Sequence, residues 1–317
     1  MVSDRLQSLN RRTFVGASAA VASTAMTGIG TAHEADDKEQ EDDDENGDDD
    51  LTDIAHRGYM GQYPENTLLA FEEASQTADM IELDVMTCKD GDVVVFHDEK
   101  LSSRDGGTRG LTDKDGYVWK MSCETVHNAE VLDSGETIPL LSEALETIPD
   151  DVAVNIEFKN PGSTEVKSST NLSGDELEKG KDRWRSFTEK ILDIAAEYDN
   201  DILVSSFYEA AIATVRETDS SIPVGYLFWD SIERGLDIAR EYDCEAVHPA
   251  YNMVKGSPFF NDDYYITDPD FADIDLVATA HEEGRAVNVY TLDTWYQTNE
   301  LVEAGVDGVI VNYPNLL

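Results

Sequence analysis

Short apolar runs alternate with longer amphipathic stretches from residue 51 to the last residue of the sequence. Short apolar runs bounded by turn residues predict buried strands, and apolar positions three and four apart predict helices that pack on them. Eight strands are predicted, at residues 51–55, 80–86, 152–158, 202–206, 224–228, 244–248, 286–290 and 306–311. Helices are predicted between them, at residues 66–76, 140–147, 184–197, 208–217, 231–242, 271–283 and 294–303.

This alternation is typical of an α/β protein, and eight such units predict a (β/α)8 barrel of the TIM type. The length of 317 residues and the 40% of hydrophobic residues suit one large globular domain. An open, doubly wound sheet is the alternative, but no glycine-rich phosphate-binding sequence follows the first predicted strand. In a barrel, the catalytic groups lie at the carboxyl ends of the strands.

One further predicted strand, residues 93–97, follows the second strand too closely for a parallel crossover. Asp90-Gly91 is a strong signal for a two-residue hairpin turn, so the chain is predicted to form an extra antiparallel hairpin here. In that register Asp84 lies directly opposite His97. The hairpin would thereby bring a carboxylate and a histidine together.

Two long polar segments follow predicted strands, at residues 99–137 and 160–182. The first is rich in Gly, Asp, Ser and Thr and is predicted to be an inserted excursion at the barrel mouth. Both segments either shape the access of a substrate or are solvated loops, and the sequence leaves the two interpretations open.

Three acidic residues occupy positions near the ends of predicted strands. Glu82 and Asp84 are two residues apart in one strand, so both point to the same face, and Glu157 ends another apolar strand. Oxygen ligands of this kind suit one hard divalent cation, Ca²⁺ or Mg²⁺, rather than zinc. Surface placement is the ordinary alternative in so acidic a chain, and the shared positions at strand ends favour a metal site instead.

Two histidines and two cationic residues accompany these acids. His56 and His97 each follow a strand-like run, and such a pair suits general acid and base catalysis. Arg57 offers a bidentate donor to phosphate, and Lys159 offers a point charge. A cation, positive side chains and a proton donor are what cleavage of a phosphodiester requires. The other histidines, His127, His248 and His281, lack such neighbours and are expected to be structural.

Taken together, these segments resemble the glycerophosphodiester phosphodiesterase family, from about residue 53 to residue 314. The matching motifs, in order, are His56-Arg57-Gly58, Pro64-Glu65-Asn66-Thr67, Glu82-Leu83-Asp84-Val85, Asp90-Gly91 with His97-Asp98, Glu157-Phe158-Lys159, and Gly305-Val306-Asp307-Gly308. The resemblance implies a (β/α)8 barrel that hydrolyses a small-molecule glycerophosphodiester to glycerol phosphate and an alcohol. It also implies the same roles for the site residues as the argument above. By the same resemblance, a glycerol hydroxyl attacks phosphorus first, and water opens the resulting cyclic phosphate.

Three residues of the matched region bear on the substrate pocket. Glu65 belongs to a family motif, although an acid that follows a proline at a helix start is also favoured by the helix dipole. Tyr290 stands where the family usually has tryptophan, and Asn312 stands where an acid is common. We expect Glu65 and Tyr290 to line the pocket or to support it, and both departures affect the fit of the alcohol portion.

Two other functions remain open at this point. Enzymes like phospholipase D or sphingomyelinase D share the two histidines and the first acidic pair, whereas Glu157-Phe158-Lys159 and the full motif at residues 64–67 favour glycerophosphodiesters. A catalytically silent phosphate-binding barrel is the second alternative. Such proteins usually lack a histidine or a metal ligand, and this sequence keeps them all.

The formal net charge of −44 is spread along the whole sequence, which predicts a salt-adapted, halophile-type surface. A field of this sign repels nucleic acid and anionic membranes, so we expect no nucleic-acid partner. We also expect no stable insertion into a membrane.

The first fifty residues predict export. Asn10-Arg11-Arg12-Thr13-Phe14 precedes a weakly apolar run of small residues, which resembles a twin-arginine signal at residues 1–32. Residues 33–50 are mostly Asp and Glu and are predicted to be a disordered linker before a phosphodiesterase domain at residues 51–317. We therefore expect the twin-arginine machinery to export the precursor to the extracellular side or the cell surface.

The three cysteines, Cys88, Cys123 and Cys244, have no paired spacing that indicates a disulfide framework or a zinc site. Buried or free thiols are expected, although one disulfide is possible outside the cytoplasm. The sequence does not choose the pair.

Overall fold

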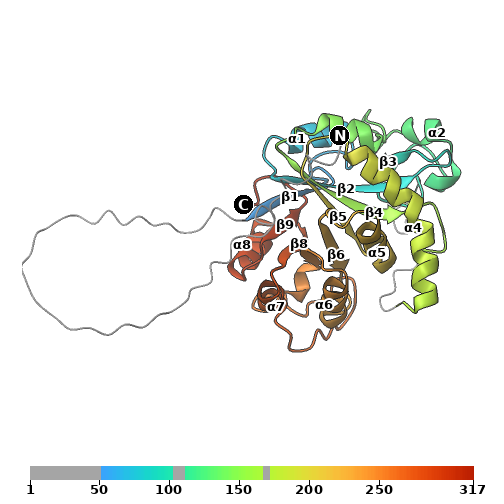
Figure 1. Ribbon diagram of the computed structural model, residues 1–317. Coiled ribbons are helices and arrows are strands. Elements are labelled where there is room, and N and C mark those ends of the chain that lie inside the picture. Colours follow the sequence, from blue (N-terminus) through green and yellow to red (C-terminus); the bar gives the residue numbers. More distant parts are fainter. Residues whose placement is uncertain (1–50, 103–110, 167–171) are drawn as a thin grey trace, which may run out of the picture.

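The computed structural model describes residues 51–102, 111–166 and 172–317, and within these residues nine strands form one sheet. Eight of the strands are parallel, and their order around the sheet is β1, β9, β8, β7, β6, β5, β4, β2, followed by the antiparallel strand β3 (Figure 1). The strands are β1 Thr52–His56, β2 Met80–Thr87, β3 Val93–Val95, β4 Ala153–Asn160, β5 Ile202–Ser206, β6 Val224–Phe228, β7 Ala246–Pro249, β8 Ala286–Leu292 and β9 Gly308–Val311.

The sheet closes on itself because β1 pairs with strands on both of its sides. Thr52 is the register partner of Gly308 in β9, and His56 is the partner of Glu82 in β2. Figure 1 shows the first and the last strand side by side, with helices around the outside of the barrel. The predicted (β/α)8 barrel is confirmed, and the open doubly wound sheet is excluded.

The helices follow the predicted order, with one large difference. The helices are α1 Leu68–Ala74, α2 Cys123–His127, α3 Leu141–Thr147, α4 Gly174–Ala195, α5 Glu209–Thr218, α6 Ile232–Glu241, α7 Leu276–Glu282 and α8 Trp295–Glu303, with short 3₁₀ turns at Val118–Lys120 and Tyr251–Met253. Helix α4 begins ten residues earlier than predicted, inside the segment that was expected to be irregular. The carboxylate of Glu176 accepts a hydrogen bond from the backbone nitrogen of Ser173 at 3.3 Å, which is half of a capping box that fixes this start.

The predicted hairpin exists, but its predicted register is wrong by one residue. Val85 pairs with Val95 and Thr87 pairs with Val93, so the loop has three residues rather than two. Gly91 has a φ of 96°, which is the left-handed conformation that closes three-residue hairpin loops. Asp84 therefore lies opposite Phe96, whose backbone nitrogen donates to the Asp84 carbonyl at 2.8 Å, and not opposite His97.

The segment at 99–137 builds a second, smaller hydrophobic cluster on the hairpin. Its buried members include Leu101, Val118, Val126 and Val131, which pack with Met86, Val94 and Phe96 of the hairpin. A disulfide joins Cys88 of the hairpin to Cys123 at the start of α2, whereas Cys244 is a free, buried thiol. The expectation of unpaired thiols was wrong for Cys88 and Cys123, because the fold brings together two positions whose spacing gave no signal.

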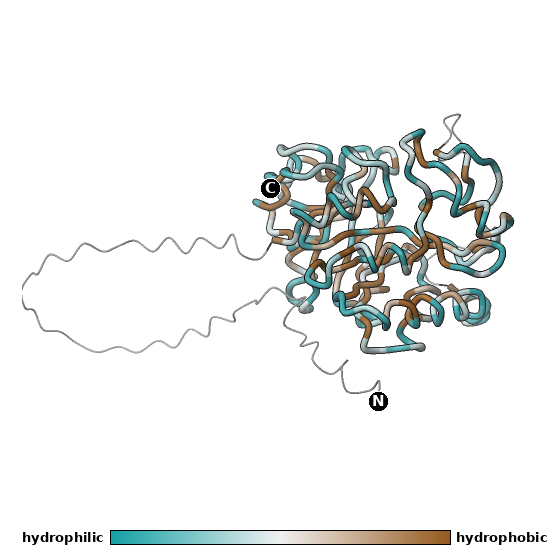
Figure 2. Tube along the Cα trace, turned by 90° about the horizontal axis from the view of Figure 1, so that it is seen from above, coloured by the Kyte–Doolittle hydropathy of each residue, from teal (hydrophilic) through white to brown (hydrophobic). Residues whose placement is uncertain are grey.

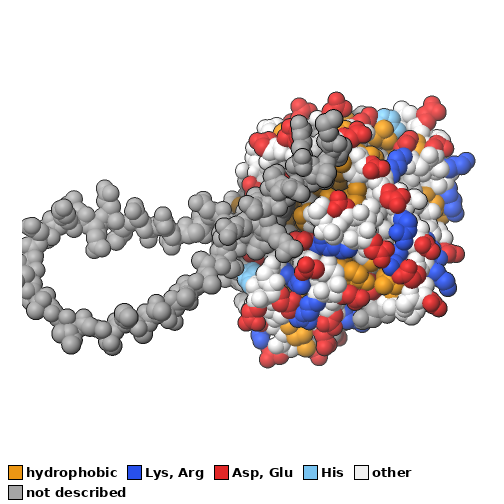
Figure 3. Space-filling view, viewed as in Figure 1, with side chains coloured by type: hydrophobic (Ala, Val, Ile, Leu, Met, Phe, Trp, Pro, Cys, Tyr) orange, Lys and Arg blue, Asp and Glu red, His pale blue; other side chains and the backbone are white. Residues whose placement is uncertain are grey.

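Hydrophobic residues lie mainly along the strands and the inner helix faces, and hydrophilic residues lie on the outer turns (Figure 2). Figure 3 shows Asp and Glu side chains scattered over the visible face, with Lys and Arg between them. Several of these charges are paired, such as Arg240 with Glu283 at 2.6 Å. Among the described residues, no helix combines the length and the apolar character that a membrane span needs.

Candidate active site

Strands β1, β2 and β4 are neighbours, and their carboxyl halves hold the predicted site residues. His56 ends β1 and is paired in register with Glu82, while Asp84 is paired with Glu157 on β4. Alternation along β2 and β4 turns these acids toward the barrel interior. The parallel register alone therefore gathers residues that are a hundred positions apart in the sequence.

The three carboxylates form one buried cluster. Glu82, Asp84 and Glu157 each offer an oxygen atom, and these atoms all lie within 4.8 Å of one another. Their exposed fractions are 2%, 0% and 6%. Buried carboxylates this close together repel one another strongly, because no water screens their charges. The cluster therefore requires positive charge nearby.

Two basic side chains supply part of that charge. The Nε atom of Arg57 lies 3.0 Å from Asp84 Oδ2, and its Nη1 atom donates to Glu65 Oε1 at 2.9 Å. The Nζ atom of Lys159 lies 3.2 Å from Asp84 Oδ1 and 2.5 Å from Glu157 Oε1. Asp84 is thus held between both cations.

The pKa values of the acids show which of them remain short of positive charge. Burial alone would raise the pKa of Asp84, but Lys159 and Arg57 hold it well below its usual range. Burial, with the charges of Asp84 and Glu157, raises the pKa of Glu82 well above its usual range. Burial, only partly opposed by Lys159, raises the pKa of Glu157 to about 7.

These residues fit a divalent cation. The Oε1 atom of Glu82 is buried without a hydrogen-bond partner among the described residues. A cation bound by Glu82, Asp84 and Glu157 would give that atom a partner and would favour the ionised forms of all three acids. The donor set is all oxygen, which suits Ca²⁺ or Mg²⁺.

His56 is held in one orientation by a chain of hydrogen bonds. Its Nδ1 atom lies 2.6 Å from Asn312 Oδ1, and Asn312 Nδ2 donates to Asp293 Oδ1 at 2.7 Å. Since the Asp293 carboxylate only accepts, it fixes the amide of Asn312 with its oxygen toward His56. His56 therefore donates from Nδ1, and its Nε2 atom is left as an acceptor, 3.9 Å from Glu82 Oε2. Burial and the adjacent Arg57 lower the pKa of His56 to about 3, which keeps the ring neutral.

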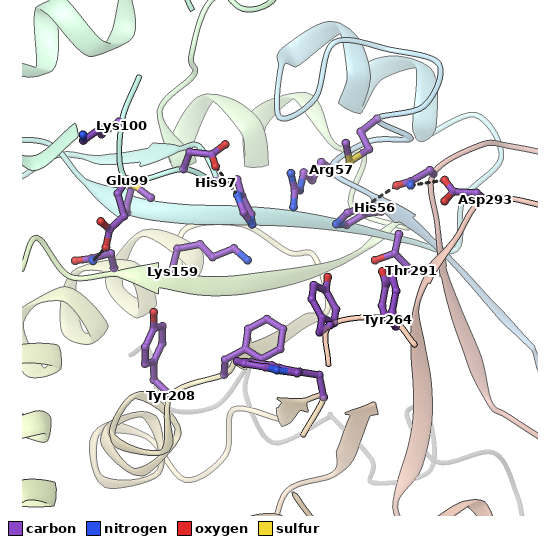
Figure 4. Close-up of a pocket in the computed structure, with 18 residues that line it drawn as sticks. His56, Arg57, His97, Glu99, Lys100, Lys159, Tyr208, Tyr264, Thr291 and Asp293 are labelled. Atoms are coloured by element: carbon purple, nitrogen blue, oxygen red, sulfur yellow. Dashed lines mark hydrogen bonds and ion pairs between the residues drawn. The ribbon is translucent and has the colours of Figure 1, made fainter. Parts of the chain in front are cut away.

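His97 lies on the other side of Arg57 from His56 (Figure 4). Its Nδ1 atom is 3.4 Å from Asp98 Oδ1. Although the predicted hairpin register was wrong, His97 still reaches the acid cluster, because β3 ends at Val95 and the chain turns inward after it.

The two histidines, Arg57 and Lys159 line a cavity of about 710 Å³. Glu99 and Lys100 line it, so the segment after β3 does contribute to the cavity. From the predicted segment at 160–182 only Asn160 lines the cavity, and the structure places it at the end of β4, so a role of that segment in access stays a prediction. A smaller connected space of about 80 Å³ extends down to Glu82, Asn155, Glu157 and Tyr290.

Five aromatic rings form the wall that faces the cations, and none of them was identified from the sequence. This wall consists of Phe207, Tyr208, Trp229, Tyr264 and Tyr265. Figure 4 shows Tyr208 and Tyr264 on the opposite side of the cavity from His97 and His56. Phe207 and Tyr208 directly follow β5, Trp229 directly follows β6, and Tyr264 and Tyr265 lie in the long loop after β7. Their position after strand ends was the only signal that the sequence offered.

Other candidate residues support the site from outside the cavity. Glu65 is buried behind Arg57. Tyr290, in contrast, lines the smaller space, as expected, and its hydroxyl donates to the Phe228 carbonyl at 3.0 Å. Asn66, which lay in a noted motif without an assigned role, donates to Asp84 Oδ2 at 2.8 Å.

The other histidines have structural partners. His127 contacts the carbonyl of Ile138 at 3.0 Å, and His281 pairs with Asp307 at 2.8 Å. His248 is fully buried, with Asn288 at 3.1 Å from its Nε2 atom.

A barrel with three buried acids, two histidines and two cationic side chains at its carboxyl end has the arrangement of a phosphodiester hydrolase. The chain belongs to the glycerophosphoryl diester phosphodiesterase family, whose family model matches residues 56–316. The protein is accordingly an enzyme, a phosphoric diester hydrolase.

Relatives support this assignment over most of the chain. A glycerophosphodiester phosphodiesterase from Bacillus altitudinis is 30% identical over 265 residues, which cover 83% of this chain and 94% of the relative. One from Caldanaerobacter subterraneus is 28% identical and covers 83% of this chain and 95% of the relative. Among solved structures, an Oleispira antarctica phosphodiesterase in complex with its product sn-glycerol-3-phosphate has a TM-score of 0.63 at 25% identity, covering 83% of this chain and 93% of that one.

Proposed function

We propose that this enzyme hydrolyses glycerophosphodiesters to glycerol phosphate and an alcohol in a divalent-cation-dependent reaction, with His56 and His97 as base and acid. The observation that carries the proposal is that both histidines, Arg57 and Lys159 line one cavity and also the small space at its base, which reaches Glu82 and Glu157. These two acids and the buried Asp84 place oxygen atoms within 4.8 Å of one another. A small-molecule substrate is also consistent with the product complex of the Oleispira antarctica relative.

The cationic side chains orient the phosphate. Arg57 and Lys159 would face its unesterified oxygens and stabilise the negative charge that develops in the transition state. A divalent cation bound by Glu82, Asp84 and Glu157 would supply further stabilisation of that charge when present. Asp84 already holds both basic residues in place, so their side chains lose little further conformational entropy when phosphate binds.

The histidines would move the protons. The free Nε2 atom of His56 takes the proton from a glycerol hydroxyl as that oxygen attacks phosphorus. His97 gives a proton to the oxygen of the departing alcohol, which leaves a cyclic glycerol phosphate. Water then opens the ring with the two histidines in exchanged roles, and both return to their starting states. The neutral tautomer set by Asn312 supports the base role of His56.

The direct test is an assay of residues 33–317 for release of glycerol phosphate from glycerophosphocholine in molar salt, with Ca²⁺ or Mg²⁺. Activity should depend on the cation and should fall by about 100-fold or more in His97→Ala. His127→Ala, which removes a histidine outside the cavity, is the matched control. No release by folded, cation-loaded protein would contradict the proposal.

A second candidate, a lysophospholipid-type substrate, is favoured by one observation. A path of neighbouring aromatic rings runs from the cavity to exposed tyrosines, and the centroids of successive rings lie 4.3 to 5.9 Å apart. In order, its members are Phe207, Trp229, Tyr265, Tyr264, Tyr251, Phe259 and Tyr296. Such a surface suits an acyl chain on the glycerol. Relatives named lysophospholipase D also match part of the chain.

Tyr296 separates the two candidates because it lies at the exposed end of the path. If the path binds an acyl chain, Tyr296→Ala lowers turnover of lysophosphatidylcholine and leaves that of glycerophosphocholine unchanged. Trp295→Ala is the matched control, since Trp295 is equally exposed and lies in none of these ring pairs. Equal effects on both substrates would remove the lipid candidate.

We further propose that the enzyme acts outside the cytoplasm. The predicted signal and linker at residues 1–50 lie outside the described residues. The disulfide between Cys88 and Cys123 supports an oxidising compartment. Replacing Arg11-Arg12 by two lysines should retain the precursor in the cytosol, as measured by fractionation. Unchanged export of that variant would contradict the twin-arginine route.

A further inference from the structure

Asn155 lies among the proposed metal ligands and has no assigned role. It is two residues before Glu157 on β4, and its Cα atom is paired in register with that of Glu82. Its side chain lines the small space at the base of the cavity together with both acids. Asn155 therefore forms the floor beneath the carboxylate cluster.

The carboxamide of Asn155 is unusual because neither polar atom has a partner. The residue is 1% exposed, and within the described residues Oδ1 and Nδ2 make no hydrogen bond. A buried amide left in this condition is costly, and buried polar groups in native proteins are nearly always paired.

Other buried asparagines of this barrel are paired. Asn66 donates to Asp84 at 2.8 Å, Asn200 donates to the Pro149 carbonyl at 2.8 Å, and Asn288 contacts His248 at 3.1 Å. These contacts hold neighbouring elements together. Asn155 makes no such contact, so a role in holding the barrel together does not account for it.

We propose that Asn155 Oδ1 is a fourth protein oxygen of the metal site, in contact with the cation directly or through one water, and that it favours Ca²⁺ over Mg²⁺. The inference rests on the cation dependence of the proposed function. A neutral oxygen adds a ligand without adding a fourth negative charge to a cluster whose acids already repel one another.

The preference for Ca²⁺ follows from coordination number. Ca²⁺ takes six to eight oxygen ligands, often including amide carbonyls, in a flexible geometry. Mg²⁺ requires a near-octahedral shell and retains several waters, so an additional protein oxygen helps it less. Removing Asn155 should therefore weaken Ca²⁺ binding more than Mg²⁺ binding.

Calorimetric titration of Ca²⁺ and of Mg²⁺ into chelator-treated protein, without substrate, tests this inference. In Asn155→Ala the Kd for Ca²⁺ should rise about tenfold or more, with a smaller rise for Mg²⁺. The matched control is Asn288→Ala, which removes a paired asparagine of the same barrel and should leave both Kd values within about twofold of wild type. The melting temperature of the metal-free protein should fall less in Asn155→Ala than in Asn288→Ala, because only the second variant leaves a buried partner unpaired.

Asn155→Asp is the second variant, and it keeps an oxygen at the same position. The added charge should lower the melting temperature of the metal-free protein, and Ca²⁺ should restore it. Unchanged Ca²⁺ affinity in Asn155→Ala, or no Ca²⁺ rescue of Asn155→Asp, would overturn the role of Asn155. If wild type binds neither cation, the proposed cation dependence itself is wrong, so the two failures are distinguishable.

Discussion

The Nδ1 atom of His56, at the end of the first strand of the barrel, lies 2.6 Å from Oδ1 of Asn312, which directly follows the last strand. An amide accepts a hydrogen bond from the neutral ring without attracting a second proton to it. A carboxylate in its place would stabilise the imidazolium form. Asn rather than an acid at this position would therefore keep His56 available for the proposed role of base.

Asn312→Asp should shift the pH dependence of catalysis. The pKa of His56, now lowered to about 3 by burial and Arg57, rises beside a carboxylate. Because a base must be unprotonated, the acidic limb of kcat/KM should move to higher pH by about one unit or more. Asn299→Asp, which adds the same charge on exposed helix α8, is the control, and superimposable profiles for the two variants would contradict the assigned role of Asn312.

Lys159→Met should have opposite effects on substrate and cation binding. Loss of a charge-assisted contact to phosphate should raise KM about tenfold or more. The same change removes the ammonium group that now lies 3.2 Å from Asp84, so the carboxylates should bind the cation more tightly. Kinetics and calorimetry measure the two effects, and Lys89→Met on the exposed hairpin loop is the control. A parallel weakening of both would contradict this account.

The stability of the metal-free enzyme should fall as the pH rises through 7. Burial raises the pKa of Glu157 to about 7, so its contribution to stability is fully present below the usual glutamate pKa and is lost as the folded-state group ionises. A bound cation prefers the ionised form, so the gap between melting temperatures with Ca²⁺ and with chelator should widen from pH 5.5 to 8.5. In Glu157→Gln the metal-free protein should show a weaker dependence, since the pKa of Glu82 is raised as well. A pH-independent gap in wild type would count against the assignment.

Removing the disulfide should destabilise the enzyme. Cys88 and Cys123 are separated by 35 residues, and a loop of that length corresponds to about 3–4 kcal/mol. The double variant Cys88→Ala, Cys123→Ala should show this loss in chemical denaturation. A reducing agent should destabilise wild type and leave the double variant unchanged; no effect on wild type would mean that the bond contributes little.

The melting temperature should rise with salt up to the molar range. The net charge of −44 disfavours the compact state through self-repulsion. Added salt shortens the distance over which these charges repel one another. The control is sucrose, an uncharged co-solute that leaves the repulsion unscreened. A melting temperature that is flat between 0.1 and 2 M KCl would contradict the salt-adapted interpretation.

The sequence predicted those parts of the site that depend on strand periodicity. Glu82, Asp84 and Glu157 could be placed because alternation along a strand and the parallel register determine which side chains meet. The register of the hairpin could not be predicted, because two-residue and three-residue loops share the Asp90-Gly91 signal. The loop has three residues, and Asp84 therefore lies opposite Phe96 rather than His97.

The remaining gaps have a different cause. Trp229 and Tyr265 reach the cavity from loops whose paths depend on packing between distant segments, so local pattern carries no information about them. Asn155 was invisible because its significance lies in the partner it lacks, which only three-dimensional neighbours reveal. The early start of α4 was missed because Leu177 is the one large apolar side chain between Gly174 and Arg183, too few for a helical pattern.

The pairing of β1 with β9 makes the catalytic centre a product of both ends of the domain. His56 ends the first strand and Arg57 follows it, yet Asn312, which sets the proton position on His56, comes after the final strand. A nascent chain that stops short of β9 would carry every acidic ligand but would leave His56 free to rotate and change tautomer. The proposed base would thereby take its working tautomer only after β9 has paired with β1.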